Sequence, residues 1–177
     1  MNLSEPESQW LEGAIVRPSP NRDERPPDTS ISLVVIHAIS LPPDEFGGPW
    51  IDDLFLGRLD PLAHPYFAGI AQLRVSAHFL IRRDGTLVQY VPCAARAWHA
   101  GASCWRGRER CNDHSIGIEL EGCDAMPFEA AQYATLNDLL TRLRAAHPIE
   151  DVVGHSDIAP GRKTDPGPCF DWSRISL

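Results

Sequence analysis

Several signatures of other protein classes are missing from this chain of 177 residues. Its formal net charge is −8 at pH 7, so it lacks the basic excess that attracts nucleic acid or an anionic membrane surface. It has no apolar run near the roughly 20 residues of a membrane-spanning helix. Its acidic first residues lack the basic start and apolar stretch of a secretory signal. We therefore expect no nucleic acid or membrane partner, and a cytoplasmic location.

Cysteine pairs of the kind that hold metals or form disulfides are also missing. The number of cysteines is odd, at five, and no two have the Cys-x-x-Cys spacing. Such a set is typical of free thiols in a reducing compartment, which again indicates the cytoplasm. The five are Cys93, Cys104, Cys111, Cys123 and Cys169.

The chain does have enough apolar side chains for one hydrophobic core. Hydrophobic residues make up 43% of it, without repeats or low-complexity runs, and the length suits a single domain. Residues 1–30 are polar and contain five prolines. We interpret them as an N-terminal arm on the surface, with one short strand near residues 13–16. The remaining residues, 31–177, form the predicted domain.

Local patterns predict the main elements of that domain. Residues 31–36 form a nearly continuous apolar run of mostly β-branched side chains, which is typical of a strand buried on both faces. The Asp-Gly pair at 84–85 separates two strand-like runs and predicts a hairpin. Pro127 followed by an apolar stripe at helical spacing predicts a helix over 128–146, with the proline suited to its first turn. Residues 151–153 read as a short strand that leads to a histidine.

Polar residues that could hold a metal follow two of these strands. His37 ends the first strand, where open α/β sheets bind ligands, and a loop rich in proline and glycine carries His155, Lys163 and Asp165. Two imidazoles and one carboxylate suit zinc, with a fourth position open for water. The gap of ten residues between His155 and Asp165 matches no helical metal motif. Taken alone, His37 is also typical of a core histidine satisfied by hydrogen bonds.

Apolar and other residues alternate along 115–122, which predicts a β-strand. The pattern does not show whether the less apolar face of this strand is exposed or covered. The apolar side chains share one face, whereas Gly117, Glu119 and Glu121 share the other. If the second face is exposed, Glu119 is an ordinary solvent-facing residue. If it is covered, the carboxylate is costly unless it is paired or used in chemistry. The pattern alone leaves both alternatives open.

Arginines cluster in two places, at 82–83 and at 106, 108 and 110. The second cluster lies in a long predicted loop that also contains Trp98. Aromatic and arginine side chains together suit the wall of a groove for a partly anionic ligand, but such clusters are equally typical of a solvated surface.

Several long motifs, taken in order, resemble the zinc-dependent N-acetylmuramoyl-L-alanine amidases, the family that includes the peptidoglycan recognition proteins and phage T7 lysozyme. The resemblance covers nearly the whole chain from about residue 13 onward. The segments that carry it are Val35–His37, Ile39–Pro43, His64–Phe67, Val75–Phe79, Arg96–Gly101, Gly107–Asp113, Ser115–Gly122, Gly154–Pro168 and Asp171–Trp172.

The resemblance implies a single α/β domain with a central mixed β-sheet flanked by helices. It implies that His37, His155 and Asp165 hold one zinc ion per chain. It also implies that Glu119 and Lys163 are catalytic. Glu119 would take a proton from the attacking water and pass it to the leaving amine, and Lys163 would stabilise the developing oxyanion.

The same resemblance assigns supporting roles to four further residues. Tyr66 matches a supporting active-site position. Arg74, Trp98 and Arg110 match positions that line the substrate groove, where guanidinium groups would meet peptide carboxylates. One departure is Ala38, because these enzymes usually carry asparagine there, and that side chain could contact the substrate or the neighbouring loop.

The implied reaction is hydrolysis of the amide bond between 1,6-anhydro-N-acetylmuramic acid and L-alanine of muropeptides, in peptidoglycan recycling and indirectly in β-lactamase induction. We expect a monomer whose partner is an anhydromuropeptide. Three alternatives are a non-catalytic muropeptide-binding module, a secreted amidase acting on intact wall, and an α/β protein with a structural zinc or no metal. The presence of all three zinc ligands together with Glu119 and Lys163 disfavours the binding module. The missing signal and the unpaired cysteines disfavour the secreted amidase. The third alternative leaves the lysine in the loop unexplained.

Overall fold

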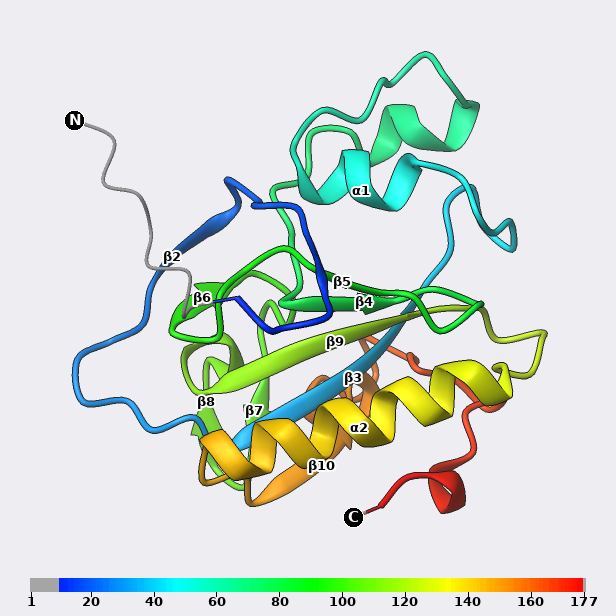
Figure 1. The fold of residues 1–177 in the computed structure, drawn as a ribbon. Coiled ribbons are helices and arrows are strands. Elements are labelled where there is room, and N and C mark those ends of the chain that lie inside the picture. Colours follow the sequence, from blue (N-terminus) through cyan, green and yellow to red (C-terminus); the bar gives the residue numbers. More distant parts are fainter. Residues whose placement is uncertain (1–9, 177) are drawn as a thin grey trace.

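A mixed six-stranded sheet forms the centre of the molecule in the computed structural model, which describes residues 10–176 (Figure 1). Four neighbouring strands run parallel, the fifth is antiparallel to them, and the short edge strand β1 pairs parallel to the fifth. In spatial order the strands are β10 (Asp151–Gly154), β3 (Leu33–Ile39), β9 (Ser115–Glu121), β4 (Phe79–Ile81), β5 (Leu87–Gln89) and β1 (Ile15–Val16). The predicted fold class, a central mixed sheet with helices around it, is confirmed.

Strands β3 and β9 are the longest and lie side by side in the middle of the sheet. Their side chains are buried on both faces over most of their length, as the β-branched run predicts for β3. The sequence predicted that strand β3 ends at His37. In the structure it continues to Ile39, because its pairing with β9 extends to Glu121. The register places His37 directly opposite Glu119, so both side chains point to the same face of the sheet.

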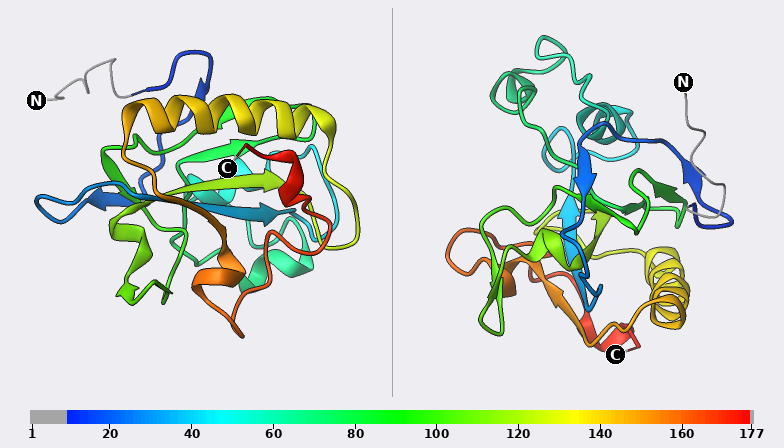
Figure 2. Two further views of the ribbon diagram at one scale, coloured as in Figure 1. Left: turned by 90° about the horizontal axis from the view of Figure 1, so that it is seen from below. Right: turned by 90° about the vertical axis from the view of Figure 1, so that its left-hand side faces the viewer.

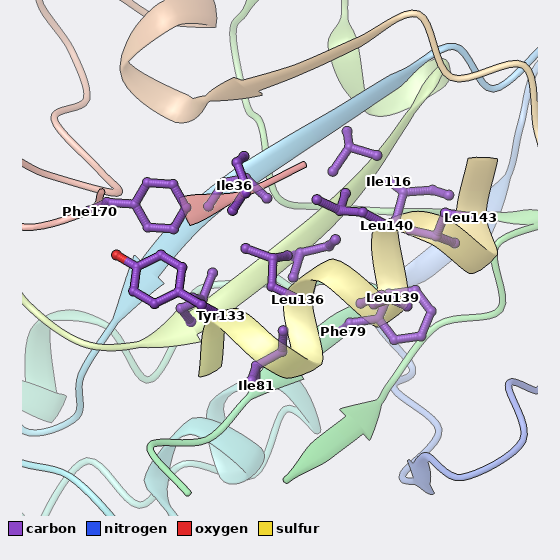
Figure 3. Packing of buried hydrophobic residues seen from close by; sticks show 14 of the residues in the cluster. Ile36, Phe79, Ile81, Ile116, Tyr133, Leu136, Leu139, Leu140, Leu143 and Phe170 are labelled. Atoms are coloured by element: carbon purple, nitrogen blue, oxygen red, sulfur yellow. The ribbon is translucent and has the colours of Figure 1, made fainter. Parts of the chain in front are cut away.

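Helix α2 (Ala130–Ala146) covers the other face of the sheet (Figure 2). Its leucines pack against β3, β9 and β4, for example Leu136 and Leu140 near Ile36 and Ile116 (Figure 3). The helix begins two residues later than predicted, because the side chain and backbone of Glu129 form a capping box with Gln132. Pro127 therefore lies before the helix and not in its first turn.

The face that carries His37 is covered by shorter elements, which form a second apolar cluster with Leu80 and Tyr90. They are helix α1 (Trp50–Phe55) and the 3₁₀ helix η2 (Pro65–Gly69). A third cluster includes Val35 of β3 and Ala100. Two smaller helices, η3 (Cys111–Asp113) and α3 (His155–Ile158), complete this part of the fold, whereas η4 (Trp172–Arg174) packs beside α2.

Two small two-stranded antiparallel sheets tie surface segments to the rest of the domain. They are formed by β2 (Arg22–Glu24) with β6 (Ala95–Ala97), and by β7 (Cys104–Trp105) with β8 (Arg108–Glu109). The described part of the predicted arm is therefore paired to the domain through β1 and β2. Arg25 also donates hydrogen bonds to four backbone carbonyls, those of Cys93, Asn112, Asp113 and Ser115. Residues 1–9 of the arm lie outside the described residues, and the boundary at residue 30 stays a prediction.

The hairpin predicted at residues 84–85 connects β4 to β5. Gly85 has a φ of 86°, which glycine adopts without strain, and Asp84 accepts a hydrogen bond from the backbone of Thr86 at 2.9 Å. Across residues 10–176, no helix combines the length and apolar character needed to cross a membrane.

Candidate metal centre and active site

Three potential metal-donor atoms lie close together on the face of the sheet that carries His37. The two Nδ1 atoms of His37 and His155 lie 3.0 Å apart, and Oδ2 of Asp165 lies 3.0 Å from the first and 3.2 Å from the second. Parallel pairing of β10 with β3 causes this approach, because Gly154, the last residue of β10, lies beside Ile36, and a histidine follows each of these two residues in the sequence. The three residues predicted from the sequence therefore meet, and they could hold a metal ion.

The protonation of this group suits a cation. Burial lowers the pKa of His37, which favours the neutral imidazole that a metal requires. Burial alone would raise the pKa of Asp165, but its hydrogen bonds with His155 and His37 outweigh that effect and lower the pKa. Two imidazoles and one carboxylate form a donor set that fits zinc.

The loop that supplies Asp165 is folded back on the strand it follows. It begins with a turn of helix, α3, so it is not irregular throughout, and Ser156 donates its backbone N–H to the carbonyl of Asp165 at 3.0 Å. A side chain at Gly154 would lie 2.8 Å from Pro166, so only glycine permits this close packing. The loop is thus held against the end of β10, which places the carboxylate beside both histidines.

Glu119 is buried on the same face without a partner. Its side chain faces inward from β9, the residue is 9% exposed, and Oε2 has no hydrogen-bond partner among the described residues. Burial and the nearby charge of Asp165 raise its pKa well above the usual range, and Lys163 only partly offsets them. Of the two alternatives left open by the sequence, the covered face is therefore correct. A buried, unpaired carboxylate in a cavity is typical of a functional site.

The predicted site residues line two adjoining cavities. The first, of about 330 Å³, is lined by seven of the nine: His37, Tyr66, Trp98, Glu119, His155, Lys163 and Asp165. The second, of about 210 Å³, shares Trp98 and Lys163 with the first and is lined by Arg74 as well. Arg110 lines neither cavity, and its Nε donates to Asp113 at 3.2 Å on the surface.

The arginine pair at 82–83 belongs to a different part of the molecule. Arg82 forms ion pairs with Asp52 at 2.9 Å and with Glu121 at 3.2 Å, and Arg83 pairs with Glu129 at 2.6 Å. Arg82, Arg83, Asp52 and Glu121 line a cavity of about 660 Å³ away from the histidines, and both arginines are paired with carboxylates. This pair is therefore neither a solvated face nor a free anion site.

His99 is a site residue that the sequence did not reveal. Its Nδ1 lies 2.9 Å from Nε2 of His37, and its Nε2 lies 3.1 Å from Oγ of Ser115. The one available signal was Gly117 on the face of Glu119, because a small residue in a strand often admits a neighbouring group. His78 is buried, and its Nδ1 accepts a hydrogen bond from the backbone N–H of Gly117 at 3.0 Å.

Comparison with known proteins defines the class of this protein. A family model described as N-acetylmuramoyl-L-alanine amidase matches residues 27–168, and the chain belongs to this family. It is 63% identical to the 1,6-anhydro-N-acetylmuramyl-L-alanine amidase AmpD of Citrobacter freundii, over 94% of this chain and 90% of that relative. The predicted family and the predicted amidase activity are confirmed.

Solved structures agree with this assignment. A crystal structure of a selenomethionine derivative of AmpD superposes with a TM-score of 0.93 at 60% identity, covering 97% of both chains. The N-acetylmuramyl-L-alanine amidase AmiD from Escherichia coli, solved with the substrate anhydro-N-acetylmuramic acid–L-Ala–D-γ-Glu–L-Lys, matches with a TM-score of 0.61 at 33% identity. That match covers 85% of this chain and 59% of AmiD.

Proposed function

We propose that the protein hydrolyses the amide bond between 1,6-anhydro-N-acetylmuramic acid and L-alanine of muropeptides with the help of one zinc ion. The observation that carries this proposal is the meeting of His37, His155 and Asp165 beside the buried, unpaired carboxylate of Glu119. The relative that is 63% identical along nearly the whole chain bears the name of this activity.

Zinc would be held by Nδ1 of both histidines and by the carboxylate of Asp165. The donor atoms are close enough to share one ion, and the lowered pKa values of His37 and Asp165 keep both in the forms that bind metals. When bound, zinc supplies Lewis-acid chemistry, which polarises the scissile carbonyl and makes a water molecule more acidic.

Glu119 would move the proton. A general base works best when its pKa lies near the working pH, and burial shifts the pKa of this carboxyl in that direction. Its unpartnered Oε2 is free to accept a proton from the attacking water. The same carboxyl would then give the proton to the leaving amine of L-alanine, which returns Glu119 to its charged form.

Lys163 and Tyr66 would assist from the rim of the cavity. Both side chains are exposed and line the cavity beside the donor group. The ammonium of Lys163 would stabilise the negative charge that develops on the carbonyl oxygen as water adds. Tyr66 would support the substrate from η2, where its ring lies at the cavity edge.

The second cavity offers a place for the stem peptide. Trp98 and Lys163 line both cavities, so the two are neighbours, and Arg74 adds a positive charge that would meet peptide carboxylates. Arg110 would contribute only if its guanidinium turned from Asp113 toward the substrate. Ala38 lines the first cavity, where the usual asparagine would reach further toward the substrate.

The enzyme would act as a cytoplasmic monomer in peptidoglycan recycling, and indirectly in the control of β-lactamase induction. Support for this role comes from the AmpD relatives. A non-catalytic binding module on the same fold is disfavoured, because Glu119 would then carry an uncompensated cost of burial.

The direct test is hydrolysis of purified anhydromuropeptides and of intact peptidoglycan, measured side by side by chromatography. We expect release of the L-alanine-linked peptide from the anhydromuropeptide, much faster than from intact wall, by protein containing about one zinc per chain. Protein without zinc that gains no activity when zinc is added would contradict the enzyme assignment. Equal rates on both substrates would contradict the recycling role alone.

A further inference from the structure

His37 and His155 differ in the hydrogen-bond partner of the ring nitrogen that points away from the proposed metal site. Each points Nδ1 toward the donor group and Nε2 away from it. Nε2 of His155 lies 3.1 Å from the backbone carbonyl of Ala100, whereas Nε2 of His37 lies 2.9 Å from the ring nitrogen Nδ1 of His99. Two consecutive residues of one segment therefore support both histidines.

This difference matters because a neutral imidazole carries only one N–H. A backbone carbonyl can only accept a hydrogen bond, so it fixes the hydrogen of His155 on Nε2 and leaves Nδ1 with a free lone pair. The ring of His99 can either accept or donate at Nδ1. The tautomer of His37 therefore depends on which nitrogen of His99 carries the hydrogen.

Ser115 is the hydrogen-bond partner on the other side of the His99 ring, and its hydroxyl can accept or donate. Its hydroxyl lies 3.1 Å from Nε2 of His99 and can accept from this nitrogen. When Nε2 of His99 donates to Ser115, Nδ1 of His99 accepts from Nε2 of His37, and Nδ1 of His37 has a lone pair for a metal. With the opposite polarity, Nδ1 of His37 carries the hydrogen and binds no metal.

A glycine at position 117 leaves space for the ring of His99 between His37 and Ser115. An added Cβ at Gly117 would lie 2.4 Å from Cγ of His99, so any side chain there would displace the ring. The segment itself is anchored, because Oδ1 of Asn112 accepts the backbone N–H of His99 at 3.1 Å and that of Ala100 at 2.8 Å. His99 is not itself in the donor group, which consists of His37, His155 and Asp165 within residues 10–176.

We propose that His99, seated over Gly117 and hydrogen bonded to Ser115, is a positioning residue that holds His37 in its metal-binding tautomer. The proposal rests on the proposed zinc site. Removing an outer partner of a metal-binding histidine typically weakens metal affinity about 10–100-fold, and this is the effect expected at His99.

The test compares His99→Phe, His99→Asn and His99→Gln by competition with a zinc chelator. Phenylalanine fills the space without an acceptor, so zinc affinity falls by about 10–100-fold. The oxygen of asparagine can take the place of Nδ1 and restores affinity to near that of the wild type. The amide of glutamine reaches the position of Nε2, so it satisfies Ser115 but not His37, and its affinity stays low.

A spectroscopic measurement checks the tautomer directly. Histidine-selective nitrogen NMR of the zinc-loaded wild type should show the hydrogen of His37 on Nε2 and that of His99 on Nε2. In Ser115→Ala the His99 signal should change while the metal-free unfolding temperature of the protein stays close to that of the wild type.

The outcomes separate this inference from the proposed function. If the wild type binds no zinc, the metal site itself is wrong. If the wild type binds zinc and folded His99→Phe binds it equally well, only the positioning role is wrong. If His99→Phe does not fold, the asparagine and glutamine variants decide, because equal zinc affinities in those two contradict the proposal and a clear advantage for asparagine supports it. A hydrogen on Nδ1 of His99 in the loaded wild type would also overturn it.

Discussion

Replacing Glu119 by glutamine should remove activity and, at neutral pH, make the metal-free protein more stable. Burial raises the pKa of this carboxyl, so between its ordinary pKa and its folded pKa the folded state holds a proton that the unfolded state has lost. The free energy of unfolding of the wild type therefore falls as the pH rises through this window. Glutamine does not ionise, so the variant escapes this loss.

The expected size follows from the lack of a partner for Oε2. Leaving a buried group without a hydrogen bond costs about 1–3 kcal/mol, and more when it is charged, so ionising this carboxyl should cost an additional amount of at least this order. The advantage of Glu119→Gln over the wild type should therefore grow by about 1–3 kcal/mol between about pH 4 and about pH 7.5. For a chain of this length that corresponds to a gain of roughly 2–12 °C in unfolding temperature.

The assay is urea unfolding followed by tryptophan fluorescence, with a chelator present at each pH. His37, His155, Lys163 and Asp165 line the same cavity as Glu119, but they are common to both proteins, so their contributions largely cancel in the difference. The matched control is Glu109→Gln in β8, an exposed position where we expect a change below about 0.5 kcal/mol at any pH. A stability difference for Glu119→Gln that does not vary with pH would refute the reasoning. The variant should still bind zinc but lose about 10²–10⁴-fold in turnover.

Three further predictions concern other parts of the site and core. Lys163→Met should lower kcat by about 10²–10³-fold with zinc affinity unchanged, and an unchanged kcat would remove it from the mechanism. Ala38→Asn should lower KM without affecting zinc affinity, and titration of substrate would reveal an unaltered or raised KM if the cavity contact is absent. Leu136→Ala, at a fully buried position of α2, should cost about 2–5 kcal/mol of stability and spare zinc affinity, with urea unfolding and chelator competition as the two measurements.

The main elements could be predicted because their signals are local. A β-branched run and an Asp-Gly pair led to β3 and the hairpin, and the apolar stripe led to α2. The start of α2 was misplaced because Pro127 was given more weight than the capping pair of Glu129 and Gln132, which determines where the helix begins. The extension of β3 beyond His37 depends on pairing with β9, which no local pattern contains.

The site could be predicted only in part, because several of its features also depend on contacts between residues that are distant in sequence. The alternation around Glu119 fits an exposed or a covered face equally well, and the ring that fills the space over Gly117 comes from His99, far away in sequence. The direction of a loop side chain such as Arg110 likewise depends on a partner, here Asp113. The family resemblance supplied the candidate metal ligands, but it gave no role to His99, which contacts His37 on the side away from the donor group.

The most direct test of the central claim is a titration of zinc into chelated, metal-free enzyme while turnover of an anhydromuropeptide is measured. We expect negligible turnover without metal, a linear rise as zinc is added, and saturation at about one zinc per chain. Full turnover without metal, or no recovery at any zinc concentration, would contradict the claim that His37, His155 and Asp165 hold a zinc ion used in amide hydrolysis.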